Sequence, residues 1–388
     1  MIEVIQNPAE FAALKDEWTE LLSAGSSGCL FLTWEWLHTW WKHLSGGKRL
    51  RIAAVRRDGR LAALAPLAVT KGLWNGLSPF SRAEFLGAGF VGSDYLDVIA
   101  RPEFKREALR ELAGWLAAEK IVLELGQLRQ GACLAEDLAL EMAARGWTVT
   151  GSPANVCPYI DLGGQTWESY LASLGSEHRY NFHRRLKNLG KQFQMRWEQA
   201  GSEESRRRAL AVLFELHNKR WEGRESGSDA FHLPGLVSFH EEFSRVALER
   251  GWLRLSVLWL DDKPAAALYG FRFGGVYYFY QSGFDPEYRK YSVGLVSMGL
   301  GIQGAIQEGA TEYDLLHGDE PYKAHWARQV RPLGRLRFYP PAARGLLYQA
   351  AALLDRASRR MARQLLPKSM AESISARIRG QGKTAHVS

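Results

Sequence analysis

The chain has 388 residues, more than one typical core accommodates, and its length suits two domains of ordinary size. Apolar residues make up 46% of the sequence, which excludes disorder over most of its length. The net charge of +8 comes from residues 341–388, which hold nine Lys and Arg against two Asp and Glu; the rest of the chain holds 41 against 40. A nearly neutral body without a helix-turn-helix or zinc motif argues against specific DNA binding.

The cysteines and the N-terminus bear on the cellular compartment. Cys29, Cys133 and Cys157 are an odd number without CxxC or Cys/His spacing, which argues against a disulfide framework and against a metal site. They are predicted to be reduced core residues. No basic stretch leads into an apolar run at the N-terminus, and no segment reaches about 18 uninterrupted apolar residues. We therefore expect a cytoplasmic protein that does not span a membrane.

One plan of elements occurs twice along the chain. An aromatic amphipathic helix precedes a pair of strands joined by a tight polar turn, which is the short-range signature of a β-hairpin. In the first half the helix carries Trp34, Leu37, Trp40 and Trp41, the strands are 50–55 and 61–69, and the turn is 57–60. In the second half the helix carries Phe239, Phe243, Val246 and Leu248, the strands are 253–260 and 265–273, and the turn is 261–264.

Each predicted hairpin is followed by a further strand, a helix and another strand. These are 95–99, 103–119 and 121–125 in the first half, and 276–282, 292–308 and 311–316 in the second. This order favours an α/β (α+β) protein with mixed, mostly antiparallel sheets covered by helices, and not a doubly wound parallel sheet.

Two interruptions suggest the domain limits. Small residues and a proline at 151–155 separate a strand at 147–150 from one at 157–161, and the motif Tyr339-Pro-Pro341 precedes a basic helical segment. We expect a first domain over 1–155, a second over 156–340 and a basic tail over 341–388. Apolar residues in the tail recur at helical spacing from Leu346 to Leu365, so it either docks on the body or binds an anionic membrane or a partner.

A candidate anion site lies where residues 285–294 leave a strand and begin a helix. Ser292 is the expected N-cap, and Arg289 and Lys290 stand beside it. Free backbone N–H groups, the helix dipole and a guanidinium together suit a pyrophosphate. The alternative is a basic turn that caps an ordinary helix.

A second candidate site is the run from Tyr313 to Lys323, where a strand ends among ionisable groups and a glycine. The alternative is a solvated loop with an incidental histidine. Helix 176–191 is rich in basic residues, including Arg179, and either grips phosphates or presents a solvated face. Arg220 and Trp221 end a helix at 204–222, and the Gly/Ser stretch at 223–228 is either a lid or a connector.

The sequence resembles the CelD/BcsL (BioF2-like) branch of the GNAT acyltransferases, which is related in architecture to the Fem peptidoglycan aminoacyltransferases. The likeness extends over roughly residues 10–340. Its most specific part is Tyr-Asp-Leu-Leu-His-Gly-Asp-Glu-Pro-Tyr-Lys at 313–323, which is similar to the family's Asp-Phe-Leu-Arg-Gly-Asp-Glu-Pro-Tyr-Lys signature. Arg220-Trp221, the segment 286–294 and Trp34 to Trp41 support it.

The resemblance implies two tandem GNAT-like domains, the first degenerate, with acetyl-CoA or another acyl-CoA bound in the second against Arg289, Ser292, Val293 and Gly294. Two positions depart from the family pattern. Ser292 stands at the first glycine of the phosphate loop, and His317 stands where the signature has arginine. The first departure keeps a Fem-like aminoacyl-tRNA donor as an alternative to acyl-CoA. The implied acceptor is an amine or hydroxyl of a saccharide or cell-envelope precursor.

Acyl transfer requires a base, donors that stabilise an oxyanion and an acid that protonates the leaving thiolate. The candidates are Asp314 or His317 as the base, Tyr322 or Tyr280 as the acid, and Lys323 as the group that stabilises negative charge. Candidates for substrate binding are Arg220, Trp221, Arg179 and Trp36. A third hypothesis, from a different class, is a non-catalytic GNAT-like binding module that tethers an envelope-assembly complex through the tail.

Overall fold

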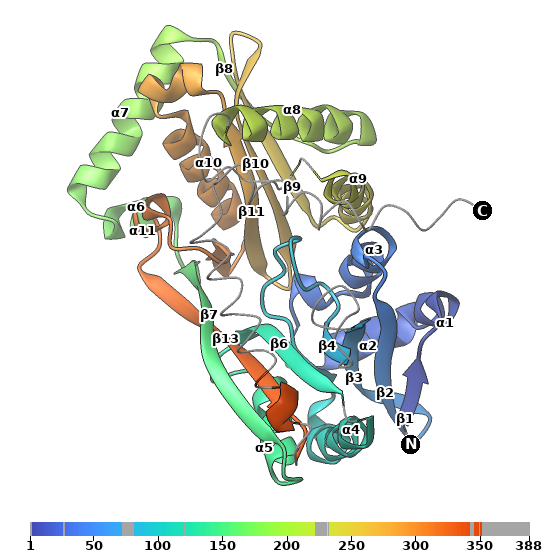
Figure 1. The fold of residues 1–388 in the computed structure, drawn as a ribbon. Coiled ribbons are helices and arrows are strands. Elements are labelled where there is room, and N and C mark those ends of the chain that lie inside the picture. The colour runs from blue at the N-terminus through green and yellow to red at the C-terminus, as the bar shows by residue number, and fades with distance from the viewer. Residues whose placement is uncertain are drawn as a thin grey trace, which may run out of the picture.

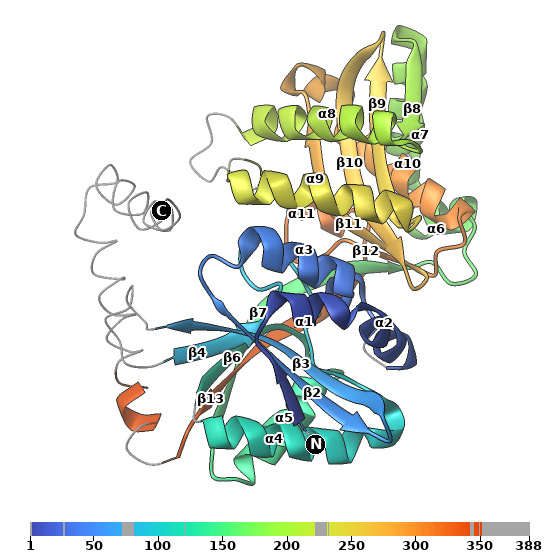
Figure 2. The ribbon, with the colours of Figure 1, turned by 90° about the vertical axis from the view of Figure 1, so that its right-hand side faces the viewer.

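The computed structural model describes residues 2–25, 28–71, 81–119, 121–221, 231, 233–341, 345–348 and 350. In these residues the strands form one continuous sheet that runs through two lobes (Figure 1). Its strand order is β1-β2-β3-β4-β6-β13-β7-β12-β11-β10-β9-β8, with β5 paired to β3. Helices cover the sheet in both lobes, as the perpendicular view in Figure 2 also shows. The predicted α/β class with a mixed, mostly antiparallel sheet is confirmed.

The first lobe is built mainly from elements that precede residue 156. Its strands are β1 (Ile2–Ile5), β2 (Arg49–Arg57), β3 (Arg60–Lys71), β4 (Ser81–Phe85), β5 (Ile99–Ala100), β6 (Val122–Arg129) and β7 (Thr148–Asp161). Its helices are α1 (Pro8–Ala13), α2 (Lys15–Ala24), α3 (Trp34–Leu44), α4 (Lys105–Glu119) and α5 (Leu134–Ala143), with short 3-10 turns at Leu30–Leu32 and Pro102–Phe104.

The second lobe repeats this plan. Its strands are β8 (Met195–Gln199), β9 (Leu253–Leu260), β10 (Lys263–Phe273), β11 (Val276–Phe284) and β12 (Glu312–Asp314). Its helices are α6 (Trp167–Ser173), α7 (Ser176–Gln192), α8 (Glu203–Trp221), α9 (Pro234–Glu249), α10 (Val293–Gln307) and α11 (Pro321–Ala324), with a 3-10 helix η3 at Pro286–Tyr291. The last strand of the chain, β13 (Gln329–Tyr339), lies in the first lobe between β6 and β7.

Both predicted hairpins form, and for the same local reason. Asp58 and Gly59 between β2 and β3 have positive φ angles, and so have Asp261 and Asp262 between β9 and β10. Two consecutive residues with positive φ make a type I′ turn, whose twist matches that of the two strands it connects. Short polar residues adopt this conformation at little cost, so the turns could be recognised in the sequence.

A parallel strand pair follows each hairpin. β4 runs parallel to β6 with α4 as the crossover, and β11 runs parallel to β12 with α10 as the crossover. α10 lies close to its neighbours because it is rich in glycine: a Cβ on Gly299 would lie only 2.1 Å from a ring carbon of Phe182 in α7. Packing against neighbouring side chains therefore explains at least this helical glycine.

The two lobes exchange strands, which the sequence did not indicate. β7 is a single strand through 148–161, so the predicted interruption at 151–155 is wrong. β13 pairs with β7 along its length and with β6 on its other side, although its residues belong to the second half of the chain. The last residues of β7 then pair with β12. Small residues and prolines in an extended segment therefore do not end the strand here, because β13 pairs with this part of β7 along one side.

The lobes also meet through α3 and α9, which pack against each other between them (Figure 2). Trp36 is fully buried there, with its ring against Phe239 and Phe243 and its indole N–H donating to Ser93 Oγ at 2.8 Å. The structure thus places Trp36, a predicted substrate-binding residue, in the core between the lobes and not on the wall of the cavity described below.

Other local predictions differ from the structure in extent. The expected strand at 95–99 is reduced to β5, because Tyr95 adopts a left-handed conformation (φ 58°). The strand expected at 311–316 is the three-residue β12. Cys29, Cys133 and Cys157 are buried free thiols. Over the described ranges, no helix is both long and apolar enough to cross a membrane. The 223–228 stretch and most of the predicted tail helix lie outside the described residues.

Candidate active site

The parallel strands β11 and β12 separate soon after they begin to pair. Their register runs only from Val276 opposite Glu312 to Tyr278 opposite Asp314. Beyond this point the chain after β12 bonds to β7 and not to β11: the N–H of Leu315 donates to the carbonyl of Pro158 at 2.9 Å. A cavity of about 640 Å³ lies at this divergence, lined by 279–282 from β11 and by 315–318 from the chain that follows β12.

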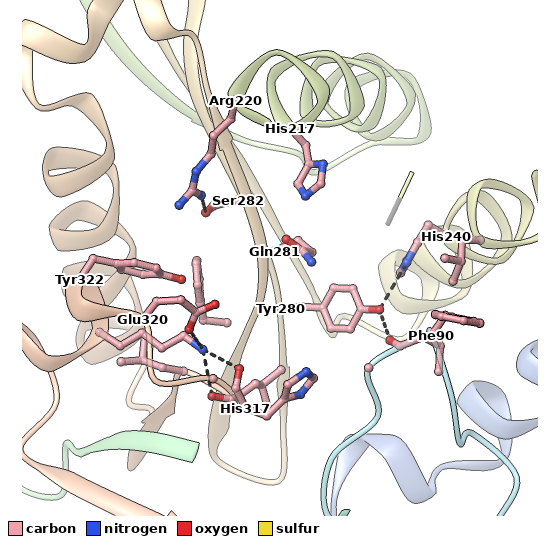
Figure 3. A pocket seen from close by; sticks show the side chains of 18 of the residues that line it. Phe90, His217, Arg220, His240, Tyr280, Gln281, Ser282, His317, Glu320 and Tyr322 are labelled. Atoms are coloured by element: carbon pink, nitrogen blue, oxygen red, sulfur yellow. Dashed lines mark hydrogen bonds and ion pairs between the residues drawn. The ribbon is translucent and has the colours of Figure 1, made fainter. Parts of the chain in front are cut away.

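Three further elements complete the cavity (Figure 3). α8 contributes His217 and Arg220, and it can approach because β11 has Gly283, where a Cβ would lie 2.5 Å from the backbone nitrogen of His217. The other walls are Leu233 with Leu236 and His240 of α9, residues 320–323, and residues 90–92 of the first half. Both halves of the chain therefore contribute to one cavity.

His317 lines the cavity and is held by a carboxylate from the first half. Its Nδ1 lies 2.9 and 3.0 Å from the two oxygens of Asp94, and its backbone N–H donates to Asp94 Oδ2 at 2.9 Å. Asp94 is fully buried, whereas the side chain of His317 keeps 38% of its surface exposed. A proton on Nδ1 satisfies the carboxylate and makes Nε2 the basic nitrogen. The hydrogen bond that His317 donates to the Asp94 carboxylate raises the pKa of His317 above its usual value near 6.5.

Lys323 fixes the backbone on which His317 stands. Its Nζ donates to the carbonyls of Leu316 at 3.1 Å and His317 at 2.7 Å, and pairs with Glu320 at 3.0 Å. Leu316 has φ 55° and Gly318 has φ 118°, so the segment is sharply bent. A buried ammonium with three oxygen partners needs no further charge partner. The geometry thus supports a positioning role for Lys323 more than the predicted stabilisation of substrate charge.

Tyr280 belongs to a directed hydrogen-bond chain. Its hydroxyl donates to the carbonyl of Val91 and lies 3.4 Å from His240 Nε2 (Figure 3). The hydroxyl of Tyr269 lies 3.5 Å from His240 Nδ1. Burial lowers the pKa of His240 to about 3, so its ring is neutral. The chain is consistent with His240 donating from Nε2 to Tyr280. Because the Tyr280 proton points at Val91, Tyr280 is the weaker of the two candidate acids.

Tyr322 and Arg220 face the cavity from its other side. The guanidinium of Arg220 donates to Ser282 Oγ at 3.2 Å and lies 5.9 Å from the ring centre of Tyr322. Burial raises the pKa of the Tyr322 hydroxyl above its ordinary value. The phenol is therefore protonated, as the predicted acid must be, although its raised pKa makes it a weaker proton donor. Both residues line the cavity.

Asp314 is placed differently from the prediction. It is fully buried, does not line the cavity, and accepts hydrogen bonds from Tyr95 at 2.6 Å, the Leu316 N–H at 2.8 Å and Arg331 at 3.1 Å. These contacts do not fit a base that must reach a substrate. They fit a residue that holds the bend before His317, with Tyr95 clamping it from the first half.

Burial raises the pKa of Asp314 to about 7, which predicts a pH-dependent stability. The folded protein holds the Asp314 proton more tightly than the unfolded chain, so this stabilisation is full below the unfolded pKa near 3.8 and is lost as pH rises to about 7. Relative to an Asp314→Asn variant, the wild type should lose at most about 4 kcal/mol of unfolding free energy over that window. Urea unfolding of both proteins from pH 4 to 8 measures it, and parallel curves contradict it.

The predicted phosphate site lies at the exposed beginning of α10. Arg289 is exposed at the end of η3, Val293 is buried, and Gly294 is exposed. Ser292 does occupy the N-cap position, but its backbone is left-handed (φ 58°) and its side chain makes no capping hydrogen bond. The N–H groups of Leu295 and Val296 donate to the Ser292 carbonyl, whereas helix geometry leaves those of Val293 and Gly294 without an intrahelical partner, so these two can meet an anion. None of these residues lines the cavity.

Two other predicted binding residues are not brought to the cavity. Arg179 lies exposed on α7, and Trp36 is in the core described above. Trp221 ends α8, and its side chain lies outside the described residues. Sequence reasoning missed Asp94 and the adjoining loop 87–92. One signal was available in the sequence: a glycine-rich loop follows a strand and ends in Ser-Asp-Tyr. Binding residues often lie in loops of this kind.

The fold and the cavity together define the class. A hairpin, then two parallel strands that diverge around a cavity with a helix crossing between them, is the architecture of a GNAT-type transferase. Residues 176–324 match the family described as acetyltransferase (GNAT) domain.

Solved structures match over nearly the whole chain. FemX is 14% identical, with a TM-score of 0.59 over 90% of this chain and 99% of that one. A conserved protein of unknown function from Bacteroides thetaiotaomicron is 12% identical, with a TM-score of 0.53 over 87% and 99%. L-PGS from Bacillus licheniformis is 14% identical, with a TM-score of 0.51 over 87% and 93%. A search of curated proteins finds no match. At these identities the likeness shows the fold alone.

Proposed function

We propose that the protein is an acyltransferase that moves an acyl group from acyl-CoA to an amine or hydroxyl acceptor, with His317 as the general base. The observation that supports this most directly is the His317–Asp94 pair, exposed to a cavity at the point where β11 and β12 diverge. The acetyltransferase family match supports the reaction class. The two halves of the chain then act as one enzyme, because the base and the carboxylate that orients it come from different halves.

The proposed step follows from these positions. The acceptor nitrogen or oxygen gives its proton to His317 Nε2 as it forms a bond to the acyl carbon. The carbon–sulfur bond then breaks, and the leaving thiolate takes a proton from Tyr322. Asp94 keeps the imidazole in the required tautomer and stabilises the imidazolium. Positioning of two substrates in one cavity supplies much of the remaining rate, and no covalent enzyme intermediate is needed.

Calorimetric titration with acetyl-CoA and free CoA tests the donor. We expect micromolar binding that weakens roughly tenfold in Arg289→Ala, because an exposed guanidinium beside free helix N–H groups contributes about 1 kcal/mol or more to phosphate binding. A truncation that ends at Pro340 should bind as the full chain does. Arg106→Ala, at an exposed arginine on α4 of the first lobe, is the matched control and should bind normally. Absence of binding to any acyl-CoA would contradict the proposed donor.

A second donor, aminoacyl-tRNA, is favoured by one feature of the structure. α7 exposes Arg179, Arg184 and Lys187, and Arg185 on the same helix bonds to the carbonyl of Lys290 beside the start of α10 at 3.2 Å. This basic surface suits a longer polyanion than CoA. If the protein transferred an aminoacyl group from aminoacyl-tRNA and did not bind acyl-CoA, aminoacyl-tRNA would be the donor.

The acceptor and location are also part of the proposal. The family resemblance supports a saccharide or other cell-envelope precursor as acceptor, and a cytoplasmic protein that contacts the membrane or an assembly complex through residues 341–388. The non-catalytic alternative gives a distinct result: tight CoA binding with no thiol release across a panel of amines and alcohols would favour a binding module over an enzyme.

A further inference from the structure

Phe90 is an exposed aromatic residue on a firmly held loop. Its side chain keeps 81% of its surface exposed, although it lines the cavity. The loop is anchored on both sides of it: Val91 accepts the Tyr280 hydroxyl, and Ser93 accepts the Trp36 indole N–H at 2.8 Å. Gly89 and Gly92, with φ of 101° and 69°, let the chain turn around it. An exposed apolar ring on a backbone that is held in place is suited to bind an apolar group of a ligand.

Phe90 stands in an apolar wall of the cavity. Val91 and Leu236 are almost completely buried beside it, and Leu233 at the start of α9 is partly buried. His240 of α9 also lies beside Phe90, with a neutral ring. The other polar lining includes Arg220 and Ser282 above, and Glu320 and Tyr322 across the cavity (Figure 3). Figure 3 shows Phe90 and Tyr322 on opposite sides of Tyr280. The side of the cavity that carries Phe90 is therefore mostly apolar and uncharged, and the charged side chains of Arg220 and Glu320 lie away from it.

The two sides suit the two substrates differently. The candidate donor site at the start of α10 and the candidate acid Tyr322 both belong to the second half, whereas Phe90 comes from the first. A donor that places its sulfur near Tyr322 leaves the opposite wall to the acceptor. The wall formed by Phe90, Val91, Leu233 and Leu236 has apolar side chains only. It therefore offers no side-chain hydrogen bonds to an acceptor that is rich in hydroxyl groups, such as a sugar ring.

We infer that the acceptor carries an apolar group next to its nucleophilic amine or hydroxyl, and that Phe90 is a specificity-determining residue that contacts this group. The inference rests on the proposed acyl transfer. It narrows the acceptor to amphiphilic molecules, such as an alkyl or lipid-linked amine or alcohol. A cavity of about 640 Å³ has room for such a group beside the thioester.

Two acceptor amines of similar basicity, n-hexylamine and ethylamine, test this inference. Because their amino groups are equally reactive, a difference in kcat/KM reports the contact made by the longer alkyl chain. With acetyl-CoA and the full-length protein, the ratio of kcat/KM for hexylamine to that for ethylamine should exceed about tenfold, because each buried methylene adds to binding. Phe90→Ala should reduce this ratio at least threefold through KM for hexylamine, with kcat and ethylamine turnover unchanged. Phe90→Leu should restore most of it.

Leu140→Ala is the matched control, since Leu140 on α5 is 72% exposed and does not line the cavity. Calorimetric binding of the two amines without donor gives a readout that is independent of turnover. Preferential hexylamine binding that Phe90→Ala abolishes, without turnover of any acceptor, would support the apolar site and refute the transferase. Equal binding of the two amines, or a ratio unchanged by Phe90→Ala, would overturn the inference. If Phe90→Ala changed only the preference for the length of the acyl chain in acyl-CoA, the apolar wall would contact the acyl group and not the acceptor, which would also overturn the inference.

Discussion

Replacing His317 with glutamine should lower kcat for acyl transfer by about 10²–10⁴-fold, the usual contribution of a general base. Glutamine retains a polar side chain of similar length and still donates to Asp94, so the fold and the carboxylate remain satisfied. It has no basic nitrogen to take the acceptor proton. The KM for acyl-CoA should stay within about twofold, because the donor is expected to bind at the start of α10. Thiol release at saturating acceptor, measured over a range of acyl-CoA concentrations, gives both values.

His325→Gln is the matched control for this variant. His325 lies exposed just after α11, eight positions further along the chain, and does not line the cavity. It should retain wild-type kcat. Equal rates for the wild type and the His317 variant, with unchanged thermal unfolding, would mean that the acceptor loses its proton elsewhere and that the His317–Asp94 pair is structural.

The elements that could be predicted from the sequence are those with local causes. Asp58 and Gly59 specify a type I′ turn wherever they stand between two strands, and the aromatic spacing from Trp34 to Trp41 specifies a helix with a buried face. The chain around His317, after the end of β12, is a further example: its ionisable residues lie close together in the sequence, and this local signal predicted a candidate site. Such signals depend only on neighbours within about ten residues.

What could not be predicted depends on contacts between distant segments. Asp94 and His317 are 223 positions apart, and neither the strand exchange of β7 and β13 nor the divergence of β11 from β12 leaves a local pattern. Asp314 illustrates the consequence. Its type and place at a strand end suit a base, but the Tyr95 contact from the other half turns it into a buried support.

The strand exchange also links the first half to the candidate site, although its own parallel strands carry none of the candidate catalytic residues. β13 joins β6 to β7, and β7 continues to β12, so the segment that carries His317 is attached to the first half through the sheet itself. Asp94 and Tyr95 then reach this segment from consecutive positions. The position of His317, the proposed base, is thus set by the junction of the lobes.

Substituting Asp94 with asparagine should lower kcat/KM by about 10²–10⁴-fold at neutral pH, because the amide reverses the tautomer of His317. The asparagine oxygen can still accept the His317 backbone N–H, but its NH₂ group then donates to Nδ1. This places the ring proton on Nε2, where the lone pair is needed. Cys157 and Gln127 also contact Asp94, so thermal unfolding should be measured alongside to show that the variant is folded.

The pH profile distinguishes this role from a structural one. In the wild type, Asp94 stabilises the imidazolium and raises the pKa of His317, so activity should fall on the acid side with an apparent pKa above 6.5. Without the carboxylate, burial opposes protonation, and the acid limb should move to lower pH. The deficit of Asp94→Asn is therefore smallest in acid. Asp314→Asn, an equivalent substitution at a buried aspartate that does not touch the His317 ring, should leave the limb in place. If both variants leave the limb unmoved while lowering the rate equally, Asp94 supports the fold and another group is the base.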